Sequence, residues 1–128
     1  MAGFTGASPI VTDGLVFAVD AANYESYPGS GTTWTDLAGT NNGTLTNGPT
    51  FDSGNGGSIV FDGTNDLVDF GKILNLGTQD MTISSWVKLT SNPSGFISIV
   101  SKSYAGGGNR YFMGADGDKK ICLLIAED

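Results

Sequence analysis

The sequence predicts an all-β domain of antiparallel strands, and three observations support this prediction. Apolar and polar residues alternate from residue 81 to 90, which is the period of a strand with one buried face. Two more apolar runs, residues 58–61 and 67–70, flank the segment DGTND at residues 62–66, whose composition is typical of a turn. No window carries a sustained apolar stripe with the period of a long helix.

The composition fits one globular domain. The chain has 128 residues, and its 20 glycines indicate many turns between short strands. An apolar content of 39% with seven phenylalanines argues against disorder, the alternative interpretation of such a glycine-rich chain. The net charge of −7 favours solubility and would repel phosphate backbones, so we expect no nucleic-acid partner.

Further strands follow from shorter patterns. Residues 14–20 (GLVFAVD) are apolar on both faces, which predicts a central strand. Asn-Gly pairs at residues 42–43, 47–48 and 55–56 favour tight turns, with short strands at 44–46 and 50–52 between them. Later strands are expected at residues 96–101, 110–115 and 120–126. About eight strands suit a two-sheet antiparallel sandwich or jelly roll.

Side chains in the connections also have expected places. Asp116-Gly117 should form a hairpin turn between the last two strands. Tyr24 and Tyr27 lie in a loop and are expected to pack back onto the sheet, and Trp34 should anchor the long connection that follows. Cys122, the single cysteine, lies in an apolar run and is expected to behave as a small core residue.

The two ends of the sequence suggest contacts with other molecules. Residues 1–12 form a small, mostly polar arm that could dock onto a partner, and residues 13–128 form the domain. The start has no secretory-signal pattern, and no apolar run is long enough to span a bilayer. The last apolar strand ends two residues before Asp128, so a further segment or a neighbouring copy should cover its edge. We therefore expect a homo-oligomer without a membrane partner.

The residues offer little catalytic chemistry. Without histidine, the Ser-His-Asp triad and most zinc sites are excluded. A pair of carboxylates is the remaining hydrolytic arrangement, but the only glutamates are Glu25 and Glu127. Asp116 and Asp118 flank a hairpin glycine, where capping of the turn explains them. We expect no enzymatic activity.

The sequence offers more candidates for ligand binding than for catalysis. Trp86 lies on the polar face of its predicted strand and could stack on a sugar ring, and Trp34, Tyr104 and Tyr111 could edge a groove. Packing against the second sheet is the alternative for each ring. Residues 62–66 and 109–118 could supply oxygen ligands to calcium, and structural turns are the alternative there.

Several segments resemble the laminin-G-like branch of the concanavalin A-like jelly rolls. They are GLVFAVDAANYESYPGSGTTWTDLAGTNNGTLTNGPTF, GSIVFDGTNDLVDFG, MTISSWVKL and IVSKS, and the similarity runs from Thr12 to Gly114. The stretch SYPGSGTTWTDLAGTNNGTLTNGPTF is similar to versions in virion proteins of tailed bacteriophages.

The resemblance implies a two-sheet sandwich that binds sugars or proteins, often with a calcium ion after the IVSK strand. The corresponding loop here, residues 103–109, offers only Asn109 as a side-chain ligand and no carboxylate, so we expect no obligatory cofactor. The Glu-x-Asp-x-Glu type motif of the glucanase branch is missing. The family domain usually continues after the RYFMGAD hairpin, which implies that residues 13–128 are an incomplete domain.

These features predict a structural protein of a tailed-phage virion, made in the host cytoplasm: a head-decoration, collar or tail-fibre protein. Its partners would be other virion proteins and a host-surface polysaccharide. The alternative is a free-standing carbohydrate-binding module of a bacterial surface or secreted protein. A glycoside hydrolase is the third hypothesis.

Overall fold

The computed structural model describes residues 11–75, 79–91, 94–102 and 110–126. Within these ranges every strand pairing is antiparallel and the only helix is a single short 3-10 turn, which confirms the all-β prediction. The chain groups into two compact units that divide after Ile73. No helix of the described ranges is long and apolar enough to cross a membrane.

The first unit contains a three-stranded sheet in the order β1-β2-β5. Its strands are β1 (Thr33–Trp34), β2 (Gly43–Thr46) and β5 (Leu67–Asp69). Leu45 of β2 lies opposite Val68 of β5 and is buried, because both side chains point to the apolar face of this sheet.

Aromatic rings pack around Phe70, the residue that follows β5. Its ring centroid lies 4.9 Å from that of Phe17 in an edge-on arrangement and 6.4 Å from that of Trp34. The expected anchoring role of Trp34 is thereby confirmed. Gly43 is buried beneath the same cluster, where a Cβ would come within 2.4 Å of the Phe70 ring. This close approach explains a glycine inside a strand.

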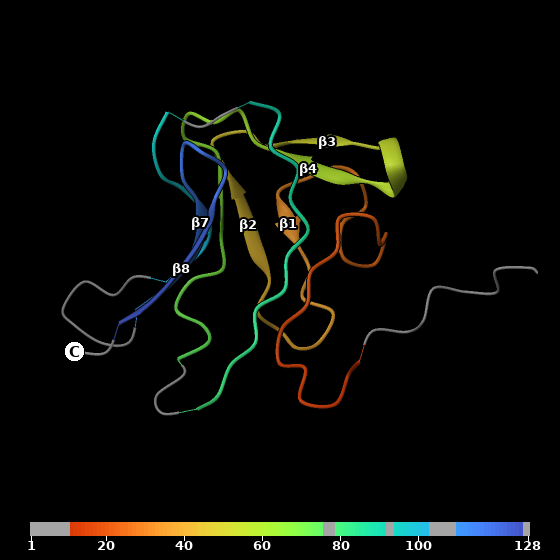
Figure 1. The fold of residues 1–128 in the computed structure, drawn as a ribbon. Coiled ribbons are helices and arrows are strands. Elements are labelled where there is room, and N and C mark those ends of the chain that lie inside the picture. Colours follow the sequence, from red (N-terminus) through yellow and green to blue (C-terminus); the bar gives the residue numbers. More distant parts are fainter. Residues whose placement is uncertain (1–10, 76–78, 92–93, 103–109, 127–128) are drawn as a thin grey trace, which may run out of the picture. The chain divides into compact units, whose positions relative to one another are not determined.

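The second sheet of this unit is a hairpin of β3 (Thr50–Asp52) and β4 (Ser58–Val60), with the 3-10 turn η1 (Gly54–Gly56) at its tip (Figure 1). Asn55 and Gly56 adopt φ angles of 55° and 96°, which the tight connection requires. The turn expected at this Asn-Gly pair is confirmed.

The other two Asn-Gly pairs do not close hairpins. Asn47 and Gly48 also have positive φ angles, 68° and 105°, but they connect β2 to β3, which belong to different sheets. Gly43 is the first residue of β2, so the turn expected at residues 42–43 is wrong. Asn42 instead accepts a hydrogen bond from the Asp36 amide through Oδ1 at 3.0 Å.

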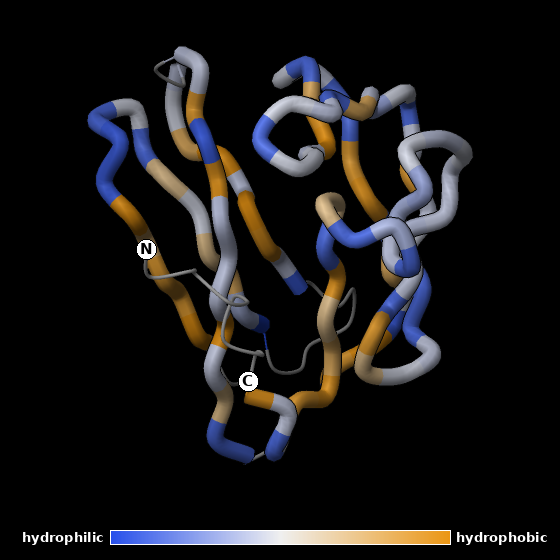
Figure 2. Tube along the Cα trace, turned by 90° about the vertical axis from the view of Figure 1, so that its right-hand side faces the viewer, coloured by the Kyte–Doolittle hydropathy of each residue, from blue (hydrophilic) through white to orange (hydrophobic). Residues whose placement is uncertain are grey.

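The second unit contains the sheet β6-β7-β8. Its strands are β6 (Ile97–Lys102), β7 (Arg110–Ala115) and β8 (Ile121–Ala126). The Asp116-Gly117 hairpin is confirmed, because the Asp116 amide donates to the Lys120 carbonyl at 3.1 Å and its carbonyl accepts from the Lys119 amide at 2.9 Å. Along the trace, hydrophobic residues concentrate in the extended segments and hydrophilic ones at the turns (Figure 2).

The central strand expected at residues 14–20 is wrong. This segment has no ladder partner among the described strands, and other groups satisfy its backbone. The Ala18 amide donates to Oδ1 of Asp36 and the Asp20 amide to Oγ of Ser26, both at 3.0 Å. Apolar residues on both faces predict burial. They do not determine whether the backbone forms its hydrogen bonds with side chains or with another strand.

The strand expected at residues 81–90 is also absent from the described secondary structure. Met81, Ile83 and Leu89 are half-buried, but Ser85 and Val87, which continue the apolar period, are exposed. No described strand pairs with the segment. A period of two reports which side chains share a face, whereas a β-strand also needs a hydrogen-bonded neighbour.

Candidate functional site

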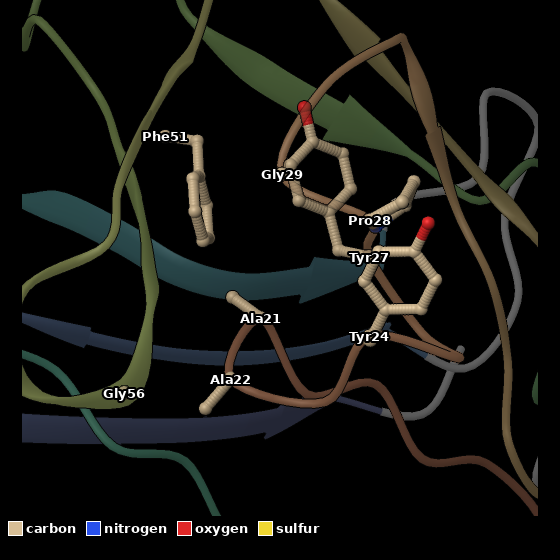
Figure 3. Close-up of a pocket in the computed structure, with 8 residues that line it drawn as sticks. All are labelled: Ala21, Ala22, Tyr24, Tyr27, Pro28, Gly29, Phe51 and Gly56. Carbon is tan, nitrogen blue, oxygen red and sulfur yellow. The ribbon is translucent and has the colours of Figure 1, made fainter.

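A hollow of about 170 Å³ lies in the first unit between the 21–29 loop and the β3-β4 hairpin (Figure 3). The loop contributes Ala21, Ala22, Tyr24, Tyr27, Pro28 and Gly29, and the hairpin contributes Phe51 and Gly56. Three of these eight residues are aromatic and none carries a carboxylate. We call this feature the aromatic hollow.

Local hydrogen bonds determine which tyrosine points inward. The Asn23 side chain accepts from the Glu25 amide at 2.9 Å, and the Asn23 carbonyl accepts from the Tyr27 amide at 2.8 Å. The resulting tight turn leaves the Tyr24 side chain 74% exposed and buries Tyr27. Asn and Asp side chains form such turns because they reach the backbone amide two residues ahead.

The Tyr27 ring forms the fixed wall of the aromatic hollow. Its hydroxyl donates to the Gly31 carbonyl at 2.8 Å, and its ring centroid lies 5.6 Å from that of Phe51. Gly57 permits this approach, since it has a φ of +132° and a Cβ there would lie 2.7 Å from the Ala21 carbonyl oxygen. The wall is therefore held by both the loop and the hairpin.

Ser26 fixes the base of the same loop and is completely buried. Its hydroxyl donates to the Thr35 carbonyl at 2.7 Å and accepts from the Asp20 amide at 3.0 Å. The Thr35 amide in turn donates to the Ser26 carbonyl at 2.8 Å. These bonds join the loop to the residues after β1, which orients Tyr24 and Tyr27.

Asp36 is a second buried polar residue beside this region. Burial raises the pKa of its carboxyl, but hydrogen bonds from the backbone amides of Ala18, Ala38, Asn41 and Gly39 outweigh burial, so the pKa lies below the ordinary value of 3.8. The carboxylate is thus charged at neutral pH and saturated with donors. Its role is to hold the backbone.

The aromatic hollow suits a ligand with an apolar face and polar edges. An exposed tyrosine ring can stack on the C–H face of a sugar ring, while its hydroxyl and nearby carbonyls bond sugar hydroxyls. The sequence predicted that both tyrosines pack onto the sheet, and this holds only for Tyr27. Asn23, one residue before Tyr24, was the available signal for a turn that directs the ring outward.

Two of the predicted binding residues lie in the second unit. Trp86 is fully exposed, whereas Tyr111 is only 5% exposed and burial raises the pKa of its hydroxyl. Tyr111 lines another hollow, of about 330 Å³, whose wall includes Phe96 and Phe112 stacked with centroids 4.4 Å apart. Trp86 does not line this hollow. Tyr104 and Asn109 lie outside the described residues.

The aspartates considered as calcium ligands serve the backbone of turns. Asp62 accepts from the Thr64 amide at 2.7 Å, and Asp66 accepts from the Asp62 amide at 2.9 Å. Asp116 accepts from the amides of Asp118 and Lys120. The turn interpretation is confirmed for these carboxylates. In the described part of the chain, no group of three or more Asp, Glu or Cys side chains is placed to hold a metal ion.

Comparison with known families settles the classification. The family model of the concanavalin A-like lectin/glucanases superfamily matches residues 62–128, just over half of the chain. The chain belongs to this superfamily. The comparisons with curated proteins and with solved structures found no match. The expected concanavalin A-like fold is confirmed, and membership of the superfamily is compatible with carbohydrate binding. The aromatic hollow, at residues 21–56, precedes the concanavalin A-like match.

Proposed function

We propose that the chain is a non-enzymatic carbohydrate-adhesion domain carried by a structural protein of a tailed-bacteriophage virion. The observation on which binding rests is the exposed Tyr24 ring beside the walls formed by Tyr27 and Phe51. The superfamily supports a sugar as the class of ligand. Trp86, fully exposed in the second unit, is a further candidate platform.

The absence of enzymatic activity is part of this proposal. The sequence contains no histidine, and Asp36, the buried carboxylate of the described residues, is occupied by backbone amides. The aromatic hollow itself has no lining carboxylate that could act as an acid or a nucleophile. A site of this composition can hold a sugar, and it lacks the groups that would cleave one.

The virion location is supported by the similarity of residues 26–51 to phage virion proteins noted above. Stacking on one tyrosine contributes about 0.5–1.5 kcal/mol, so a single domain binds weakly. Many copies on one particle convert weak sites into strong attachment through their high effective concentration. A site that binds sugar weakly therefore suits a virion component that is present in many copies beside other virion proteins.

Binding is tested with Tyr24→Ala in the full chain, titrated with oligosaccharides from bacterial capsules and lipopolysaccharides by NMR. We expect the affinity to fall about 3- to 10-fold, because the stacking surface is lost. Tyr24→Phe is the matched control and should keep most of the affinity, since it retains the ring. Equal binding by the wild type and Tyr24→Ala would refute the aromatic hollow as the site.

The location is tested separately by mass spectrometry of purified virions from a culture that carries the gene. The chain should be found in the particles at a fixed ratio to the major capsid protein. Recovery only from the bacterial surface or the culture medium would favour the free-standing carbohydrate-binding module instead.

A further inference from the structure

The net charge of the chain lies entirely in the unit that contains the aromatic hollow. Residues 1–73 carry eight carboxylate side chains and a single basic side chain, Lys72, whereas residues 74–128 carry five of each kind. The first unit thus accounts for the whole formal charge of −7. A surface with this imbalance attracts cations and repels anions within about 8 Å, the screening length at physiological salt.

Two of these carboxylates adjoin the aromatic hollow on its loop side. Asp20 lies just before the lining residues 21–22, and its Oδ1 accepts a hydrogen bond from the Ala22 amide at 2.9 Å. Glu25 follows Tyr24, the exposed ring of the hollow. Both acidic residues are exposed, so a bound molecule can approach their charges.

A third carboxylate adjoins the hollow on the hairpin side. Asp52 follows the lining residue Phe51 in β3, and its Oδ1 accepts a hydrogen bond from the Gly54 amide at 2.8 Å. This bond holds the carboxylate at the tip of the hairpin, where Gly56 of η1 lines the hollow. Asp52 is also exposed, and no basic side chain is among the eight lining residues. Negative charge therefore reaches the hollow from both of its sides.

The walls of the hollow add a second attraction for a cation. Tyr24 and Tyr27 of the loop and Phe51 of the hairpin all present aromatic rings there (Figure 3). The face of an aromatic ring attracts a cation that lies within about 6 Å of the ring centroid. The volume of about 170 Å³ is below the roughly 300 Å³ of a pocket for a drug-sized ligand, so the hollow suits one terminal group of a larger molecule.

We propose that the aromatic hollow binds an amino sugar that carries a free ammonium group. The aromatic rings contact the charged sugar, and Asp20, Glu25 and Asp52 stabilise its positive charge from the edges of the hollow. The same carboxylates repel an acidic sugar, and a neutral sugar gains only the stacking contact. This inference rests on the proposed function, because it names the class of sugar that the same site takes.

A disaccharide of glucosamine, compared with its N-acetylated form, tests the preference, because the two share their rings and differ in charge. The full chain is titrated with each by NMR at physiological salt and about pH 6, where the sugar amine is protonated as an α-amino group would be. Glucosamine should bind at least about 5-fold more tightly. A cation–π contact at an exposed site contributes about 2- to 5-fold, and the nearby carboxylates add to it. A disaccharide of glucuronic acid should bind more weakly than either.

Two sets of variants separate this site from a general attraction to an acidic surface. Tyr24→Ala should weaken the binding of the glucosamine disaccharide about 3- to 10-fold, since the ring is lost. Asp20→Asn combined with Asp52→Asn keeps the rings and the acceptor oxygens and removes two charges. It should weaken glucosamine binding about 2- to 10-fold and leave the binding of the N-acetylated form unchanged. Circular dichroism verifies that each variant is folded.

Asp62→Asn is the matched control for the double variant. Asp62 is exposed and follows β4, at the end of the hairpin away from η1, so its removal should not affect binding. Equal affinity for the glucosamine disaccharide and its N-acetylated form, or an equal loss in Asp62→Asn and in the double variant, overturns the inference and leaves carbohydrate binding intact. Failure to bind these disaccharides and the bacterial oligosaccharides alike overturns the proposed function as well.

Discussion

The amide of Ala18 donates a hydrogen bond to Oδ1 of Asp36 at 3.0 Å, across 18 residues of sequence. Asp36 also accepts from the amides of Ala38 and Asn41, at 3.0 and 3.2 Å. One carboxylate thus joins the segment before the 21–29 loop to the connection after β1. The geometry of the aromatic hollow depends on it through Ser26 and Thr35.

The first prediction concerns pH. Because the pKa of Asp36 is lower in the folded chain than its ordinary value of 3.8, the carboxylate stabilises the fold at all higher pH values. This contribution should be lost as the pH falls below 3.8 and through the folded pKa. Urea denaturation from pH 7 downward measures it. Asp36→Asn should lose about 1–3 kcal/mol at pH 7 and show a flatter acid profile.

Asp62→Asn serves as its control, since Asp62 is exposed and caps a surface turn. That variant should change stability by less than about 0.5 kcal/mol. An acid profile of Asp36→Asn that matches the wild type would contradict the role given to this carboxylate.

The second prediction concerns Gly43. A Cβ at this position would lie 2.4 Å from Cε1 and 2.7 Å from Cδ1 of Phe70, so Gly43→Ala must displace the ring. Overpacking of this kind costs about 1–3 kcal/mol. Chemical denaturation should detect the loss. Gly48→Ala is a useful comparison, because nothing lies within 4 Å of its Cβ and only its φ of +105° is strained.

The third prediction is a stabilising change. Lys119 adopts a φ of 61° in the β7-β8 turn, a left-handed conformation that costs a non-glycine residue about 1 kcal/mol. Lys119→Gly should raise the free energy of unfolding by about 0.5–1 kcal/mol, measured by thermal melting. Lys120→Gly, at the residue before β8, should not stabilise the chain. A lower melting temperature for Lys119→Gly would show that the Lys119 side chain stabilises the fold by more than its left-handed backbone conformation costs.

The fourth prediction concerns the different effects of Tyr111 and Trp86, two candidate binding residues, on stability. Tyr111 is buried, so Tyr111→Ala should destabilise the chain by about 3–5 kcal/mol, whereas exposed Trp86→Ala should change stability by less than about 0.5 kcal/mol. Loss of glycan binding in Trp86→Ala can therefore be assigned to contact with the sugar. The same loss in Tyr111→Ala would be explained by unfolding, which a circular dichroism spectrum would reveal.

The fold class was predictable because turns and alternation are local signals. The hairpin at Asp116-Gly117 and the turn at Asn55-Gly56 form where the sequence places them. Residues 81–90 show the limit of such reasoning. Their period is that of a strand, yet pairing depends on a partner distant in the sequence, which periodicity does not specify.

The candidate site was less predictable for the same reason. Asn23 is a local signal for the turn at Tyr24, but the burial of Tyr27 depends on the Gly31 carbonyl and on Phe51 of the β3-β4 hairpin. Ser26 and Asp36 appear ordinary in the sequence and become important only through bonds to residues 9 and 18 positions away. Buried polar networks of this kind are tertiary features.

The short connection between β7 and β8 has a kinetic consequence. A hairpin with a three-residue loop needs little chain closure and forms within about 1–10 μs, before distant segments can meet. The uncharged strand ICLLIA is then presented early, while other newly made chains are also incomplete. Refolding yield should therefore decline as protein concentration rises, because an uncharged apolar strand that forms early can pair with the same strand of another partly folded chain.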